Sequence, residues 1–281
     1  MDERVCEPEW LARDYAMKKR QWIMCHGEGP VVAAAIHDGH DISPEVAARI
    51  TIDDARRLRE EDPVTYRMTS TADNRITVTC SRFMVDLNRP REKAVYRSPE
   101  DAWGLHLWRE PPTERMIARS LVIYDRFYEE LHEYLSFLKE RHGFFVVLDL
   151  HSYNHRRNGP DAPPEDPKLN PDINIGTQTL LDREPWEPLI KRCIADMRGF
   201  DYFGRRLDVR ENVKFKGGYM AEWIHKNFAG SALVLSVEFK KIFMDEWTGN
   251  VDLIQVERLH TLLKCTIPGI EKSLQRMGAR I

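Results

Sequence analysis

The chain has 281 residues, a length that suits one large α/β domain with a sizeable core. Its 42 lysine and arginine residues against 45 aspartate and glutamate residues give a net charge of −3, which lacks the strongly basic balance of a generic nucleic-acid-binding protein. With 42% hydrophobic and 31% charged residues, the composition excludes disorder as the main state.

The N-terminal segment, MDERVCEPEW, is charged from its second residue and lacks the apolar core and cleavage site of a signal peptide. No apolar run approaches the roughly 20 residues that cross a bilayer, and the five cysteines include no Cys-x-x-Cys pair. These features predict a cytoplasmic protein without a membrane partner. Because no repeat or Gly/Ser linker divides the chain, we expect one domain over residues 1–281, with 1–28 as an N-terminal extension.

In the first half of the chain, a continuous apolar run at 30–36 predicts a central strand buried on both faces. A helix is expected over 44–59. The segment 76–87 alternates more and predicts two short strands or one bent strand. Over 113–142, apolar side chains recur at steps of three and four, which predicts a long helix closed by Gly143.

The second half begins with another apolar strand at 144–150, followed at 158–177 by a Pro-, Asn- and Asp-rich stretch that predicts a long irregular loop. A helix is expected over 186–198, a third apolar strand over 232–239, and a helix over 251–277 that is bent or split at Pro268. The alternation of strands and helices predicts an α/β fold with a mostly parallel or mixed central sheet and helices on both faces.

Polar side chains follow or end the three apolar strands. The first strand runs into His37, the second into His151, and the third contains Glu238 near its end. Ligands of open α/β sheets bind outside the carboxyl ends of the strands. If the three strands are neighbours, these residues meet in one crevice suited to metal and proton chemistry.

Histidines in this set predict a metal site. His37 and His40 are three residues apart in a turn kept compact by a glycine, and neutral imidazole suits Zn²⁺. A catalytic zinc needs three protein ligands, and His37, His40 and His151 are the expected set. The alternative is that His40 is only a loop histidine with local hydrogen bonds. Glu61 and Asp62 are the competing third ligands. They rank lower because an acidic run before a proline is usually a solvated helix end.

Two further carboxylates have open interpretations. Asp149 lies on the same side of its strand as His151, so it either orients that histidine as a metal ligand or binds loop amides as a structural residue. A carboxylate inside an apolar strand is costly unless it is paired or useful. Glu238 is therefore either the general base for a metal-bound water or half of a buried ion pair.

Arginines near these residues predict an anionic ligand, because guanidinium groups bind carboxylates bidentately. Arg82, Asn88 and Arg89 lie in one short segment, and Arg156 and Arg157 follow His151 closely. A metal site ringed by arginines indicates a hydrolase of small acidic substrates.

Six motifs together resemble the N-formylglutamate amidohydrolase family, whose fold is similar to that of the zinc carboxypeptidases, a phosphorylase/hydrolase-like α/β arrangement. They occur in order from about Pro30 to Glu246 and read HDGH, SRFMVDLNRP, VLDLHSYNHRR, PDINIGT, KGGY and VEFKKIFMDE. The resemblance implies a zinc-dependent deformylase that cleaves N-formyl-L-glutamate to formate and L-glutamate in histidine breakdown.

Carried over by residue, the resemblance implies that His37 and His151 are metal ligands and that Glu238 is the catalytic carboxylate. Asn88 and Arg89 resemble the Asn-Arg pair with which the carboxypeptidases hold a substrate carboxylate. Arg82 and Arg156 are expected to assist in binding. Zinc carboxypeptidases have a glutamate where this chain has His40, and many deformylases have Ser-Gly where it has Asp-Gly, which suggests a divergent subgroup.

Two alternatives stay open. The first is a zinc hydrolase of another N-acyl amino acid or of a short peptide end, with the loop at 158–177 as the specificity element. The second is a non-catalytic protein that binds small carboxylates through the same arginines. Neither alternative has a nucleic-acid partner, and the sequence leaves the oligomeric state undefined.

Overall fold

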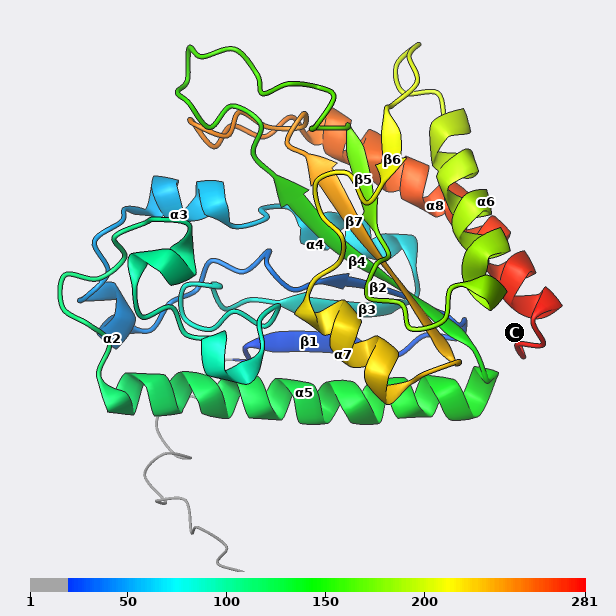
Figure 1. Ribbon diagram of the computed structural model, residues 1–281, viewed down its shortest axis with the longest axis horizontal. Helices are drawn as coiled ribbons and strands as arrows, with labels where there is room; N and C mark the ends of the chain where they lie inside the picture. Colours follow the sequence, from blue (N-terminus) through cyan, green and yellow to red (C-terminus); the bar gives the residue numbers. More distant parts are fainter. Residues whose placement is uncertain (1–19) are drawn as a thin grey trace, which may run out of the picture.

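The computed structural model describes residues 20–281, in which seven strands form one mixed sheet (Figure 1). The spatial order of the strands is β1-β3-β2-β4-β7-β5-β6. Strands β3, β2, β4 and β7 run parallel to one another, and β5 and β6 are parallel as well. The pairs β1–β3 and β5–β7 are antiparallel. The strands are β1 Trp22–Cys25, β2 Val31–Ala35, β3 Asn74–Val78, β4 Phe145–Tyr153, β5 Ile173–Gly176, β6 Val209–Glu211 and β7 Ala232–Lys240.

Helices cover both faces of this sheet, so the predicted α/β class is confirmed. Side chains of α5 and α7 pack on one face, and those of α6 and α8 pack on the other. The α-helices are α2 Pro44–Ala47, α3 Asp54–Glu60, α4 Thr65–Met68, α5 Glu114–His142, α6 Glu187–Gly199, α7 Tyr219–Asn227 and α8 Leu253–Arg276. Short 3-10 helices occur at Thr69–Thr71, Arg91–Lys93, Pro99–Ala102 and Glu184–Trp186.

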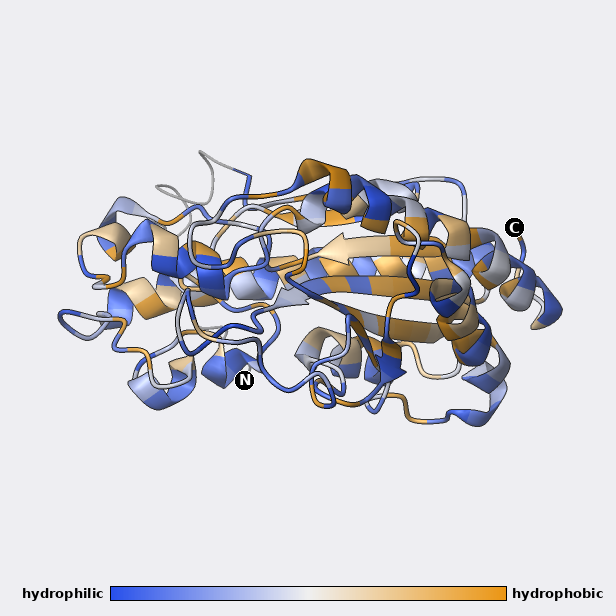
Figure 2. Ribbon diagram, turned by 90° about the horizontal axis from the view of Figure 1, so that it is seen from above, coloured by the Kyte–Doolittle hydropathy of each residue, from blue (hydrophilic) through white to orange (hydrophobic). Residues whose placement is uncertain are grey.

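The continuous apolar strands are buried on both faces, as their composition predicts. Every residue of β2 and β4 is buried. Val31 and Ala33 pack toward α6 and α8, whereas Val32 and Ala34 pack toward α5 and α7. Figure 2 shows the resulting distribution, with hydrophobic strands at the centre and mostly hydrophilic loops around them.

The long helix predicted over 113–142 is confirmed as α5. The hydroxyl of Thr113 accepts a hydrogen bond from the amide of Met116 at 3.2 Å, which caps the first turn. The helix ends where Gly143 adopts a φ of 81°, a conformation that costs glycine little.

Three boundaries differ from the predictions. The segment 44–59 forms two helices, because Asp53 accepts a hydrogen bond from the amide of Arg56 at 2.8 Å and starts α3 separately. Helix α8 runs through Pro268 without a split, since buried leucines and isoleucines on both sides of the proline pack against the sheet. The loop expected over 158–177 ends in β5, which is fully buried beside β7.

Part of the expected N-terminal extension belongs to the sheet. Its residues 22–25 form β1, which pairs with β3 at the edge of the sheet. Residues 1–19 of the expected extension, with Cys6, lie outside the described part of the chain. Within that part, Cys25, Cys80, Cys193 and Cys265 are free thiols, and no helix is both long and apolar enough to span a bilayer.

Candidate metal centre and substrate cavity

The three strands that end in candidate site residues are neighbours. Strand β4 lies between β2 and β7, and the register of β4 and β7 pairs His151 with Glu238. His37 follows the end of β2. The predicted convergence of these residues at the carboxyl ends of the central strands is therefore confirmed.

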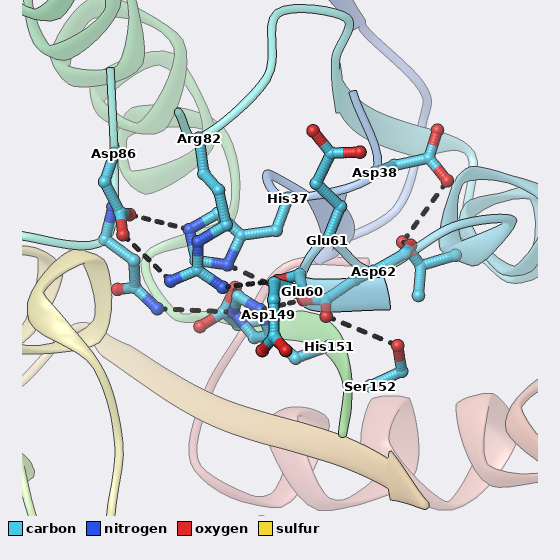
Figure 3. Close-up of polar contacts among 12 residues, drawn as sticks. His37, Asp38, Glu60, Glu61, Asp62, Arg82, Asp86, Asp149, His151 and Ser152 are labelled. Carbon is cyan, nitrogen blue, oxygen red and sulfur yellow. Dashed lines mark hydrogen bonds and ion pairs between the residues drawn. The ribbon is translucent and has the colours of Figure 1, made fainter. Parts of the chain in front are cut away.

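A buried group of His37, Asp62 and His151 lies at this edge (Figure 3). One potential ligand atom of each residue lies within 4.8 Å of the others. The Nδ1 atoms of His37 and His151 are 3.6 and 2.9 Å from Oδ2 of Asp62. Two imidazoles and one carboxylate form a donor set typical of catalytic zinc sites.

The structure does not bring His40 to this group, which corrects the expected set of ligands. Nδ1 of His40 pairs with the carboxylate of Glu61, and its Nε2 lies 2.9 Å from Nη2 of Arg57. Glu61 also accepts a hydrogen bond from Ser81, so this alternative third ligand is engaged elsewhere as well. Asp62 is the third member of the group.

Asp62 reaches the group because the acidic run is not a solvated helix end. Glu60, Glu61 and Asp62 are all buried. The amide of Asp62 donates to the carbonyl oxygen of His37 at 2.9 Å, which ties the end of α3 to the end of β2. The charge of these three residues predicts exposure to solvent, whereas their backbone is hydrogen-bonded to the end of β2.

Each imidazole is held from behind by a second carboxylate. Oδ1 of Asp86 lies 2.7 Å from Nε2 of His37, and Oδ1 of Asp149 lies 2.9 Å from Nε2 of His151. Such contacts fix the tautomer and orientation of a metal-binding histidine. The position of Asp149 fits its orienting interpretation. Sequence reasoning gave Asp86 no such role, although the residue stands in the DLNRP motif.

These contacts shift the pKa values of Asp62 and His151. Burial opposes the ionisation of Asp62, but hydrogen bonds from His151 and His37 outweigh it and lower the pKa of Asp62. Burial likewise opposes the charge on His151, yet Asp149 and Asp62 raise the pKa of that imidazole well above its usual value. Buried carboxylates thus surround the histidines with negative charge, an environment that suits a cation.

Glu238 lies outside the three-residue group and lines the same cavity. Burial raises the pKa of Glu238 to about 8, although the nearby positive charge of His151 opposes this shift. A carboxyl group with such a raised pKa, placed beside candidate metal ligands, is typical of a general acid–base residue.

A cavity of about 440 Å³ opens over the centre. Its basic side chains are Arg59, Arg82, Arg89, Arg157, Lys214, Lys216 and Lys241. Its acidic side chains are Glu60, Asp62 and Glu238. This excess of positive charge fits the prediction of an anionic ligand.

Arg156 does not line this cavity, which corrects its expected position. Its guanidinium donates to the carbonyl oxygen of Pro160 at 2.6 Å, away from the histidines. The neighbouring Arg157 lines the cavity instead and donates to Glu60 at 3.3 Å. The chain leaves β4 at Tyr153 and turns at Arg157 and Asn158, and of the two arginines Arg157 lines the cavity.

The other predicted substrate-binding residues, Arg82, Asn88 and Arg89, all line the cavity. Arg82 donates to Asp86 at 2.8 Å, so much of its hydrogen-bonding capacity serves the carboxylate behind His37. Nη2 of Arg89 donates to the carbonyl of Asp101 at 3.1 Å. Nδ2 of Asn88 lies 3.4 Å from Nε2 of His151, which places this amide at the edge of the centre.

The fold and the site together define an α/β protein with a candidate metal centre beneath a cationic cavity. A sequence model of the N-formylglutamate amidohydrolase family matches residues 29–241, which is most of the chain. The chain therefore belongs to the N-formylglutamate amidohydrolase family.

Solved structures are similar in fold. The crystal structure of N-formylglutamate amidohydrolase from Ralstonia eutropha is 16% identical, with a TM-score of 0.71 over 92% of this chain and 99% of that one. A gene product from Agrobacterium tumefaciens is 18% identical, with a TM-score of 0.57 over 87% of this chain and 91% of that one. No curated protein sequence matches this chain significantly.

Proposed function

We propose that this protein hydrolyses N-formyl-L-glutamate to formate and L-glutamate and that His37, Asp62 and His151 hold a divalent cation, Zn²⁺ in the simplest case. The observation that supports this proposal most is the buried group of two imidazoles and one carboxylate beside Glu238, at the base of a cationic cavity. Membership of the N-formylglutamate amidohydrolase family supports the choice of substrate.

The residues of the centre divide into three roles. When bound, the cation supplies a Lewis acid that polarises the formyl carbonyl and favours deprotonation of water. Glu238 accepts the proton of the attacking water and passes it to the departing amine of glutamate. Asp86 and Asp149 hold the two histidines in place through the contacts at 2.7 and 2.9 Å.

The cavity walls hold the substrate. Arg89 and Asn88 bind a substrate carboxylate and bring the formyl group to the centre. Arg82 acts through Asp86, since its guanidinium donates to that carboxylate. N-formylglutamate has two carboxylates, and the seven basic side chains of the cavity suit this charge.

The direct test is formate release from protein stripped of metal with a chelator and then reloaded with Zn²⁺. We expect removal of the metal to abolish turnover of N-formylglutamate and Zn²⁺ to restore it. Full activity of the stripped protein, with no metal left in elemental analysis, would contradict the proposal.

A panel of substrates tests the specificity. We expect N-formylglutamate to be turned over at least about tenfold better, in kcat/KM, than N-acetylglutamate or N-formylleucine, because a lost ion pair or a clash costs more than 1.4 kcal/mol. A preference for another N-acyl amino acid would support the alternative hydrolase. Thermal stabilisation by N-formylglutamate without turnover would support the carboxylate-binding alternative.

Gly218→Ala is expected to lower kcat/KM about 10- to 100-fold, because small displacements of a substrate-positioning group have effects of this size. A Cβ at Gly218 would lie 2.3 Å from both Nδ2 and Oδ1 of Asn88. The backbone of Gly218 has a φ of −101°, which alanine adopts freely, so the clash with Asn88 is the expected cause.

Gly199→Ala is the matched control for this substitution. Gly199 lies at the end of α6, and a Cβ there would meet no atom within 4 Å. We expect its kcat/KM to stay within about twofold of the wild-type value. Steady-state formate release by both variants makes the comparison, and an unchanged Gly218→Ala enzyme would argue against a role of Asn88 in binding.

A further inference from the structure

Lys241 is a buried cation to which the roles described so far assign no contact of its own. It directly follows β7, its side chain is 1% exposed, and it lines the cavity over the candidate metal centre. Its Nζ donates to the carbonyl oxygens of Arg59 and Glu61 at 2.6 and 2.8 Å. Both acceptors belong to the backbone that leads directly into Asp62.

The two carbonyl groups lie at the C-terminal end of α3. The last carbonyls of a helix lack partners within the helix and attract positive charge. Asn154 donates to the same carbonyl of Arg59 at 2.8 Å. Lys241 and Asn154 thus attach the end of α3 to the ends of β7 and β4, the strands that contain Glu238 and His151.

Asp62 depends on this attachment more than the other members of the group do. His151 lies within β4 and His37 lies two residues after the end of β2, whereas Asp62 lies in the connection between α3 and α4. The amide of Asp62 donates to the carbonyl of His37, and Lys241 holds the carbonyl of the preceding residue. Both polar groups of the peptide bond between Glu61 and Asp62 are therefore held by hydrogen bonds.

We propose that Lys241 is a positioning residue that holds Asp62 within reach of His37 and His151 and so sets the metal affinity of the centre. This role rests on the proposed metal site. The two possible effects of Lys241 on metal affinity have opposite signs. An ammonium group near a metal site repels the cation, so removing its charge alone would tighten metal binding. Loss of the hydrogen bonds that position Asp62 would weaken metal binding.

The test measures Zn²⁺ affinity by competition with a chromophoric chelator for metal-free wild type, Lys241→Met and Lys240→Met. We expect Lys241→Met to bind Zn²⁺ about 10- to 100-fold more weakly, the range found when outer contacts of metal ligands are removed. Lys240→Met is the matched control. Its Nζ pairs with Asp172 at 2.7 Å, away from the cavity, and its affinity should change less than about twofold.

A double-mutant cycle shows whether the effect passes through Asp62. In an Asp62→Ala background, Lys241→Met should weaken Zn²⁺ binding by less than about twofold further, because the side chain that it positions is gone. An equal loss in both backgrounds would indicate a general structural role and overturn the proposal. Zn²⁺ binding as tight as in wild type, or tighter, would overturn it as well.

Hydrogen exchange provides a readout that needs no metal. The amide of Asp62 should exchange faster in Lys241→Met than in wild type or Lys240→Met. Unchanged exchange would overturn the anchor even if wild type binds no Zn²⁺, an outcome that by itself contradicts only the proposed metal site. If Lys241→Met fails to fold, Asn154→Ala tests the same anchor by the same two measurements, with weaker Zn²⁺ binding and faster exchange expected.

Discussion

Asp62→Ala is expected to weaken Zn²⁺ binding by at least about 100-fold and to remove formate release with it, because it deletes one of the three proposed ligands. The carboxylate of Asp62 is the only negatively charged member of the group, and its Oδ2 faces Nδ1 of both histidines. Its loss leaves two neutral or cationic imidazoles, which bind a divalent cation poorly.

His40→Ala is the matched control, because His40 is the ligand that the sequence favoured. Both of its ring nitrogens face other partners, Glu61 and Arg57. We expect its Zn²⁺ affinity and its kcat to stay within about threefold of wild type. Titration of both metal-free variants with Zn²⁺ shows whether Asp62 or His40 is the third ligand. Retained binding in Asp62→Ala together with lost binding in His40→Ala would reverse the assignment.

Glu238→Gln is expected to lower kcat about 10²- to 10⁴-fold, the usual contribution of a general base. Glutamine keeps the shape of the side chain and cannot accept the proton of water. Since Glu238 is not one of the three clustered residues, Zn²⁺ affinity should remain close to that of wild type. A loss of kcat with retained metal and little change in KM would identify an effect on the chemical step.

Glu60→Gln provides the comparison for this variant. Glu60 is another acid that lines the cavity, but its carboxylate pairs with Arg157 at 3.3 Å. We expect its kcat to change less than about fivefold. Metal content and formate release measured on both variants separate a base from a general change in cavity charge. Near-normal turnover by zinc-loaded Glu238→Gln would show that another group accepts the proton.

Much of the fold could be predicted because its long elements have strong patterns. The apolar runs that became β2, β4 and β7 and the stripe of α5 predict buried strands and an amphipathic helix directly. Strands β1 and β6 have four and three residues, too few for a periodicity to emerge. Their positions depend on pairing with distant strands.

The candidate site was predictable where its residues sit on those long elements. His37, His151 and Glu238 follow from the ends of β2, β4 and β7. Asp62 is harder to predict, because its acidic neighbours resemble a solvated surface in the sequence. The tertiary contacts that bury this segment, among them those of Asp62 with His37 and of Lys241 with Glu61, leave no pattern in the sequence. The sequence favours Arg156 for substrate binding, whereas Arg157 lines the cavity, because the turn after β4 that orients the two side chains leaves no periodic pattern in the sequence.

The pairing of His151 with Glu238 across β4 and β7 has an evolutionary consequence. Opposite residues on neighbouring strands keep a spacing of about 4.8 Å that the hydrogen-bonded ladder enforces. Loop insertions cannot alter it, whereas Asp62, Arg157 and Lys216 lie on connections that drift more freely. Sequence changes on these connections can therefore alter the cavity walls while the spacing between the proposed metal ligand and the proposed base stays the same.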